Sequence, residues 1–350
     1  MSRVFSIAGR PVGPGHRPYV IAELSANHLG GIERAFAIME AAKRAGADAV
    51  KLQTYTADTM TIDHDGPGFV IEGGLWDGRK LYDLYKEAHT PWDWHEALFA
   101  RARELGIAVF STPFDATAID LLERLGTPAY KIASFEAVDL ALIARAAQTG
   151  KPLIISTGMA DRDEIAQSLD AARAAGGRDI VLLHCVSSYP ADPADSNLRT
   201  IPVMAAEFDV LVGLSDHTPG SAVAVAATAL GACAIEKHLT LRRADGGPDS
   251  AFSLEPEEFA RLVAETTVSH AALGAVSFAP EASEGAMRKL RRSLYVVADM
   301  AEGEVFTAKN LRAIRPGLGL APRHLPDILG MRASASIKRG TPLQWQLVKT

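Results

Sequence analysis

Cysteine is scarce in this chain, since only Cys185 and Cys233 occur among 350 residues. Both lie inside apolar runs, and the sequence has no C-x-x-C motif. Buried, reduced thiols are the ordinary state of such residues. We therefore expect neither a disulfide framework nor a thiolate zinc site.

Long apolar runs and basic clusters are also missing. The N-terminal segment MSRVFSIAGRPVG lacks an apolar core of signal-peptide length, and no uncharged apolar stretch is long enough to span a bilayer. The 36 basic and 42 acidic residues give a net charge of −6 without a basic stripe. We expect a cytosolic protein with no membrane or nucleic-acid partner.

Short apolar segments alternate with amphipathic helical segments along most of the chain. Continuous apolar strands separated by helices are typical of a parallel sheet covered by helices. Eight such units over about 250 residues predict a (β/α)8 TIM barrel, with an open doubly wound sheet as the alternative. No G-x-G-x-x-G turn follows the first strand, which argues against a dinucleotide fold. The expected strands are residues 19–24, 49–54, 108–113, 129–134, 153–158, 180–186, 210–216 and 233–240.

The pattern changes after Leu273, which predicts a second domain. We expect the barrel in residues 1–280, a polar and partly helical linker in residues 281–292, and a small β domain in residues 293–350. This second domain is too small for a large core of its own, so we expect it to dock against something. The longest irregular stretch within the barrel is residues 56–91, and loops of that length are often functional.

Polar side chains follow every predicted strand. In barrels of this kind the chemistry lies at the C-terminal ends of the strands. A single buried polar group is usually just hydrogen-bonded, but eight strand ends in succession predict an active site. The candidates include Glu23, Lys51, Thr112, Lys131, Ser134, Glu136, Ser156, Ser187, Tyr189, Ser215, His217, Glu236 and His238.

Lys51 and Lys131 end different strands, at equivalent places. With several hydroxyl groups nearby, they predict a ligand rich in anionic oxygen, such as a phosphate that also carries a carboxylate. The alternative is a Schiff-base aldolase in which Lys131 reacts with a carbonyl substrate. Two lysines favour charge pairing over a single activated amine.

His217 and His238 end neighbouring strands and, with Glu23 across the barrel, could hold a divalent metal. The residues alone leave this open, because histidines are also common hydrogen-bonding groups. The other strand-end and loop histidines show no partner pattern, and we expect structural or surface roles for His28, His64, His95 and His184.

Several motifs, taken together and in order, resemble the sialic acid synthase family. They are IAELSANHLGG, GADAVKLQTY, STPFD, YKIASFE, ISTGMA, GLSDHT and IEKHLTL…GPDSAFSLEP, and the C-terminal RPGLGL resembles the antifreeze-like (SAF) domain of that family. The resemblance covers nearly the whole chain. AELSANH and GGLWDGRKLYDLYKEAHTPWDWH are most similar to the branch that makes pseudaminic acid.

The resemblance implies a reaction and a set of ligands. The family condenses phosphoenolpyruvate (PEP) with an N-acetylated sugar in its open aldehyde form and releases phosphate by C–O cleavage. Mn²⁺ is the implied metal, with Mg²⁺ or Co²⁺ as alternatives, held by His217 and His238. Glu23 would orient a water or the aldehyde. The residues implied to bind PEP are Lys51, Thr112, Lys131, Ser134, Ser156 and Ser215.

The resemblance also implies how the sugar is held. Glu136, Tyr189 and Asp249 would bind it, as would Ser187, which replaces the Asn of sialic acid synthases and so implies a sugar other than N-acetylmannosamine. Arg315 would reach the barrel of a partner subunit and hold an N-acyl group, which predicts a domain-swapped homodimer. The expected sugar is a diacetamido-trideoxyhexose, and the product would modify flagellin or a surface polysaccharide.

The sequence is also compatible with two alternative functions. Within the family, sialic or legionaminic acid synthesis differs only in details of sugar binding. Outside it, a carbohydrate- or ice-binding module could be built around the C-terminal domain, although a passive scaffold needs no polar residues at every strand end.

Overall fold

The computed structural model describes residues 4–349. Within them, eight parallel strands close into a barrel, and the last strand pairs with the first. This confirms the predicted TIM barrel and excludes the open sheet. The strands are β3 (Tyr19–Glu23), β4 (Ala49–Thr54), β5 (Ala108–Pro113), β6 (Tyr130–Ile132), β7 (Leu153–Ser156), β8 (Ile180–Cys185), β9 (Leu211–Asp216) and β10 (Ala234–His238).

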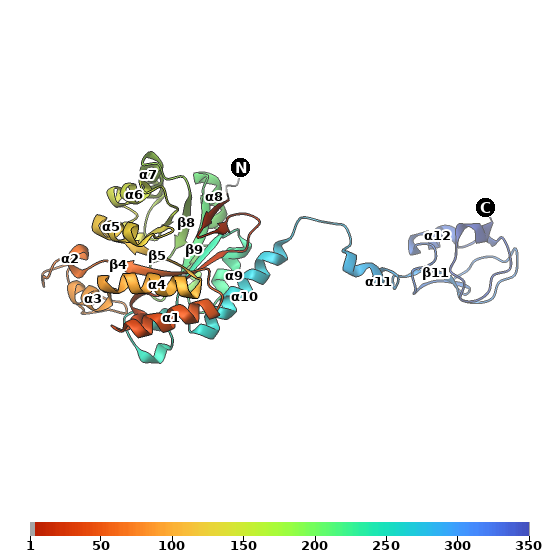
Figure 1. Ribbon diagram of the computed structural model, residues 1–350. Helices are drawn as coiled ribbons and strands as arrows, with labels where there is room; N and C mark the ends of the chain where they lie inside the picture. The colour runs from red at the N-terminus through yellow and green to blue at the C-terminus, as the bar shows by residue number, and fades with distance from the viewer. Residues whose placement is uncertain (1–3, 350) are drawn as a thin grey trace. The chain divides into compact units, whose positions relative to one another are not determined.

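Helices surround the barrel (Figure 1). Their ends follow local sequence signals: the Asp115 carboxylate accepts hydrogen bonds from the backbone N–H groups of Thr117 and Ala118 at the start of α5, and Gly126 ends that helix at a φ of 73°. The outer helices are α1 (Ile32–Arg44), α4 (His95–Leu105), α5 (Ala116–Leu125), α6 (Leu140–Ala147), α7 (Arg162–Ala174), α8 (Thr200–Phe208), α9 (Ala222–Ala229) and α10 (Pro256–Leu273).

Alternate residues of each strand face opposite sides of the barrel wall. In β3, Val20 and Ala22 pack in the core between strands and helices, whereas Tyr19 and Ile21 pack in a separate core inside the barrel. The same alternation holds in the other strands, because side chains of a strand point to opposite faces in turn. The inner core fills the half of the barrel near the strand starts, so the inner-facing residues beyond it belong to the opposite, C-terminal half.

An N-terminal hairpin, which the sequence did not predict, adds to the inner core. Its strands are β1 (Phe5–Ile7) and β2 (Arg10–Val12), paired antiparallel. Phe5, Ile7 and Val12 pack with the first residues of the barrel strands. The hairpin therefore closes the end of the barrel opposite to the strand-end polar residues.

The segment 56–91 is more regular than predicted. It contains α2 (Ala57–Met60), α3 (Leu81–Ala88) and an isolated bridge between Val70 and Lys80. Thr56 begins α2 with a capping box, in which its side chain accepts from the Thr59 backbone. Helix signals this short were not separable from loop in the sequence.

Contacts divide the described chain into two compact units, which meet in the sequence at Gly274 and Ala275. The second unit has its own apolar core, which includes Leu294, Phe306 and Ile328. The boundaries expected from the sequence, at 280 and 293, stay predictions. The elements of this unit are α11 (Gly285–Arg288), β11 (Ser293–Val296), β12 (Leu311–Ile314), α12 (Leu325–Ile328), β13 (Arg332–Ala333) and β14 (Val348–Lys349).

None of the helices in residues 4–349 combines the length and the hydropathy that crossing a membrane requires.

Candidate active site

The alternation of the strands decides which strand-end residues share the interior. Every second residue after an inner-core residue also faces the barrel interior. In seven of the eight strands, residues at these positions near the strand end are polar. Because these residues lie beyond the apolar core, they form a single polar cluster at the C-terminal end of the barrel, in which all but the partly buried Gln53 are buried. They are Glu23, Lys51, Gln53, Thr112, Lys131, Ser156, Ser215, Glu236 and His238.

Two lysines and two glutamates form the centre of this cluster. Lys51 pairs with Glu23, and its Nζ lies 3.7 Å from Oε1 of Glu236 and 3.0 Å from Oγ1 of Thr112. Lys131 Nζ lies 3.1 Å from the same Oε1 of Glu236. All four charged residues are at most 4% exposed. The structure thus brings Lys51 and Lys131 together, as the sequence predicted.

The pKa values follow from burial and from this pairing. Burial opposes the charge of Lys51, but the carboxylates of Glu23 and Glu236 outweigh burial and raise its pKa. Burial likewise acts to raise the pKa of Glu236, but the two lysines outweigh it and lower the pKa. For Glu23 burial prevails over Lys51 and the pKa is raised, and for Lys131 burial lowers the pKa. Glu23 is therefore the carboxylate of the cluster that most readily takes a proton.

Glu236 was among the strand-end residues of the sequence, but it was not assigned a role. Its position between both lysines makes it the central anion of the cluster. Two other charged residues at strand ends, Lys237 next to it in β10 and Asp216 in the neighbouring β9, face the helices and pair with each other at 2.7 Å. The sequence alone does not separate these cases, because both faces of these strands carry apolar residues, as Ala234 and Ile235 show.

Serine hydroxyl groups line the next part of the wall. Ser134 and Ser187 hydroxyl oxygens lie 2.8 Å apart, and Ser215 donates to Glu236 over 3.5 Å. Ser156 Oγ is buried and has no hydrogen-bond partner among the described residues. Buried hydroxyl groups are normally paired, so Ser156 is available to a ligand oxygen.

Gly158 lies directly behind the two serines, and its replacement tests their arrangement. A Cβ there would come within 2.3 Å of Ser187 Oγ and 3.3 Å of Ser134 Cβ. We expect Gly158→Ala to separate the serine pair and to lower kcat/KM by up to about tenfold, as loss of a neutral hydrogen bond would. Steady-state kinetics measure the loss, and Gly285→Ala, where a Cβ meets nothing within 4 Å, is the control. Unchanged kinetics in Gly158→Ala would show that the pair is not needed.

His217 and His238 lie side by side, with ring centroids 5.5 Å apart. His217 Nδ1 is 2.9 Å from the backbone oxygen of Val186, and His238 Nδ1 is buried without a partner among the described residues. Burial lowers the pKa of both imidazoles, which keeps them in the neutral form that binds metals. The pair therefore fits a metal ion as two nitrogen ligands.

The suggested third ligand is not confirmed. Glu23 pairs with Lys51, and residues 4–349 contain no group of three or more His, Cys, Asp and Glu side chains placed to hold a metal. A cation here would take its remaining ligands from water or substrate, which is usual for a Lewis-acid site.

Aromatic rings form the outer part of the mouth. The Tyr189 ring lies 4.3 Å from His217, 5.1 Å from Phe252 and 5.5 Å from Trp76, measured between centroids. Phe252 had no predicted role. Trp76 comes from the segment 56–91, so this segment does contribute to the mouth, as its position after the second barrel strand suggested.

Two predicted sugar-binding carboxyl groups lie in this outer region. Asp249 is partly buried and bonded to Ser25, and Glu136 Oε2 is buried without a partner among the described residues. Burial raises the pKa of Asp249 and raises that of Glu136 to about 7. Arg315 belongs to the second unit, where it follows β12 and is exposed, so its role stays a prediction.

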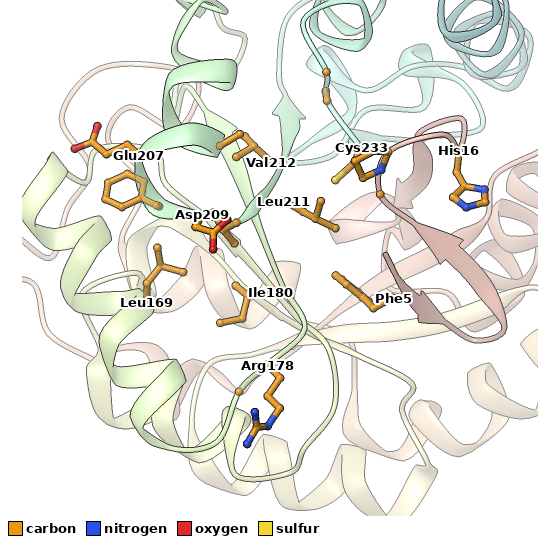
Figure 2. A pocket seen from close by; sticks show the side chains of 18 of the residues that line it. Phe5, His16, Leu169, Arg178, Ile180, Glu207, Asp209, Leu211, Val212 and Cys233 are labelled. Atoms are coloured by element: carbon orange, nitrogen blue, oxygen red, sulfur yellow. The ribbon is translucent and has the colours of Figure 1, made fainter. Parts of the chain in front are cut away.

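A cavity of about 1140 Å³ lies at the opposite end of the barrel (Figure 2). Figure 2 shows Ile180 and Leu211, which begin β8 and β9, together with Phe5 of the hairpin. Cys233 also lines the cavity, but burial raises its pKa to about 12, so it is not a nucleophile. The charged cluster, rather than this cavity, is the candidate active site.

Comparison with known proteins agrees with the fold and the order of the motifs. Residues 38–277 match the NeuB family, and residues 291–349 match the SAF domain. The chain belongs to the NeuB family. The family resemblance found in the sequence is thereby confirmed, and the second unit of this NeuB protein contains a SAF domain.

Among relatives of this NeuB protein, the pseudaminic acid synthase of Helicobacter pylori is 45% identical over 93% of this chain and 96% of its own. The pseudaminic acid synthase of Campylobacter jejuni is 43% identical over 93% of this chain and 95% of its own. A solved N-acetylneuraminic acid synthetase from Leptospira borgpetersenii, in complex with citrate, is 31% identical over 82% of this chain and 95% of its own, with a TM-score of 0.74.

Proposed function

We propose that this NeuB protein is a pseudaminic acid synthase. It would condense PEP with 2,4-diacetamido-2,4,6-trideoxy-L-altrose and water to give pseudaminic acid and phosphate. The main support for this reaction is the buried Lys51–Glu236–Lys131 cluster, because the polyanion PEP needs paired cations inside the barrel. The identity of 43% to 45% with two pseudaminic acid synthases supports the choice of sugar.

PEP would bind with its carboxylate and phosphate oxygens on Lys51 and Lys131. The hydroxyl groups of Thr112, Ser134, Ser156 and Ser215 would complete the donors, and Ser156 has no competing partner among the described residues. The negative charge of PEP would compete with Glu23 for Lys51. Because the pKa of Glu23 is already raised by burial, this carboxylate, once released from Lys51, is suited to accept a proton from the attacking water.

The sugar aldehyde would lie near His217 and His238. A divalent cation held by these two imidazoles, Mn²⁺ in our proposal, would supply Lewis-acid polarisation of the aldehyde. Glu136, with a pKa raised to about 7 by burial, can give a proton to a sugar oxygen near neutral pH. Tyr189, Ser187 and Asp249 would bind the rest of the sugar.

The proposed reaction forms one carbon–carbon bond and breaks one carbon–oxygen bond of PEP. C3 of PEP bonds to the aldehyde carbon, which leaves positive charge at C2 that the neighbouring carboxylates Glu23 and Glu236 stabilise. A water oriented by Glu23 adds its oxygen to C2 and gives one proton to the Glu23 carboxylate. The bond between C2 and the bridging phosphate oxygen then breaks, and phosphate leaves with that oxygen. The new hydroxyl group at C2 gives its proton to the departing phosphate and becomes a carbonyl.

The reaction is tested by phosphate release from PEP with Mn²⁺ and three sugars in parallel: N-acetylmannosamine, 2,4-diacetamido-2,4,6-trideoxy-mannose and the altrose. Turnover with the altrose alone supports the proposal. Turnover with a different sugar would support the PEP condensation but contradict the proposed sugar substrate. No phosphate release with any sugar contradicts the PEP condensation.

We also propose that Arg315 binds the sugar acyl group in the barrel of a partner subunit, within a domain-swapped homodimer. Arg315→Ala is then expected to raise the sugar KM at least about tenfold, as loss of a hydrogen bond from a charged donor does, with little change in the PEP KM. The nearby exposed Arg312→Ala is the control. Equal changes in both KM values, or a monomer in sedimentation experiments, would argue against this role.

A further inference from the structure

Ser25 stands just beyond β3 in a backbone conformation that favours glycine. Its φ is 49°, in the left-handed region, and the residue is 1% exposed. A side chain at such a φ is strained, and strained residues persist where the surrounding structure holds them. We therefore expect an interaction of the Ser25 hydroxyl group to offset this backbone strain.

The hydroxyl group of Ser25 makes two such interactions inside the mouth of the barrel. It donates to Oδ2 of Asp249, and it accepts from Nε2 of Gln53 over 3.2 Å. The same Gln53 nitrogen lies 3.2 Å from Oε1 of Glu23. Ser25 thus joins the charged cluster, through Gln53, to the carboxylate of Asp249.

The backbone around Asp249 has other anchors. Trp76 Nε1 donates to the backbone oxygen of Pro248 over 3.0 Å, and Ser253 Oγ donates to the backbone oxygen of Asp249 over 2.6 Å. The carboxylate itself is held by Ser25 and by the backbone N–H of Ala26, at 3.2 Å, and both bonds reach Oδ2. Removing the Ser25 hydroxyl group would therefore leave the carboxylate held by the Ala26 N–H alone, with the loop still anchored.

We propose that Ser25 is a positioning residue that supports sugar binding by orienting the Asp249 carboxylate. With Oδ2 held by Ser25 and Ala26, Oδ1 is directed to accept a hydrogen bond from a hydroxyl or acetamido N–H group of the sugar. This inference rests on the proposed function, since it concerns the sugar that the enzyme condenses with PEP.

Two variants separate the hydroxyl group from the backbone strain. Ser25→Ala keeps the strained Cβ and removes the hydroxyl group, whereas Ser25→Gly removes both. We expect both variants to raise the sugar KM about tenfold or more, as loss of a hydrogen bond to a charged group does, with the PEP KM changed less than about twofold. Ser25→Gly should also melt at a higher temperature than Ser25→Ala, because glycine tolerates this φ.

The control is Ser168→Ala, which removes another buried serine hydroxyl group, bonded to the Ile165 backbone in α7. It should alter the melting temperature without altering either KM. A sugar KM within twofold of wild type in Ser25→Gly would overturn the positioning role, as would equal increases in both KM values. The assays use whichever sugar the wild-type enzyme turns over, so these results overturn the Ser25 inference alone. Absence of turnover with every sugar would overturn the proposed function and this inference together.

Discussion

Replacing both His217 and His238 by alanine is expected to lower phosphate release at least about a thousandfold, because Lewis-acid stabilisation of the reacting oxygen contributes several kcal/mol. The two neutral imidazoles are neighbours, and His238 Nδ1 has no partner among the described residues. Removing both should also remove bound metal. Metal content after dialysis against Mn²⁺, determined by elemental analysis, gives a readout that does not depend on activity.

The matched control is His184→Gln. His184 also stands near the end of a barrel strand, but it has the opposite alternation and bonds to the Ser196 backbone oxygen at 2.6 Å. It should retain metal and turnover. Chelation of the wild-type enzyme should reproduce the loss, and added Mn²⁺ should reverse it. Full activity of the double variant in metal-free buffer would contradict the metal role.

Lys51→Met is expected to destabilise the protein by about 3–5 kcal/mol and to abolish detectable PEP saturation. The stability loss arises because Glu23 and Glu236 would be left buried without this partner, and breaking a buried ion pair costs about that much. The loss of PEP binding arises because the same ammonium group is proposed to hold the substrate. Chemical denaturation and steady-state kinetics measure the two effects separately.

Two further variants distinguish stability from binding. Lys237→Met breaks a different buried pair, with Asp216, on the helix side of the wall, so it should destabilise the protein while preserving the PEP KM. Adding Glu23→Gln to Lys51→Met should restore part of the stability without restoring PEP binding. If Lys51→Met kept the wild-type PEP KM, Lys51 would be structural only.

The sequence predicted the barrel because each of its strands and helices is specified by a local pattern. The apolar strand segments, the helix between each pair and the capping residues all act within a few residues along the chain. Signals that depended on packing were missed: the N-terminal hairpin is stabilised by the inner core, to which Phe5 and Ile7 contribute, and α2 is too short to be distinguished from loop.

For the site, the sequence predicted that both lysines and both histidines lie at strand ends, and the structure brings each pair together. It did not separate Glu236 from Asp216, since both are acidic residues in neighbouring strands. Their roles depend on which face of the strand each occupies, and a shift of one residue reverses the face. The register that decides this comes from pairing with neighbouring strands.

By itself, then, the sequence determined that this is a NeuB-type barrel whose strands end in polar residues, because strand, helix and family motifs are local patterns. Only the tertiary structure decided that Glu236 lies between the two lysines, that Lys237 and Asp216 face away, and that Ser25 holds Asp249. Ser25 and Asp249 are 224 residues apart in the chain. They meet because the last barrel strand pairs with the first, and closure of the barrel is a property of the whole sheet rather than of any segment.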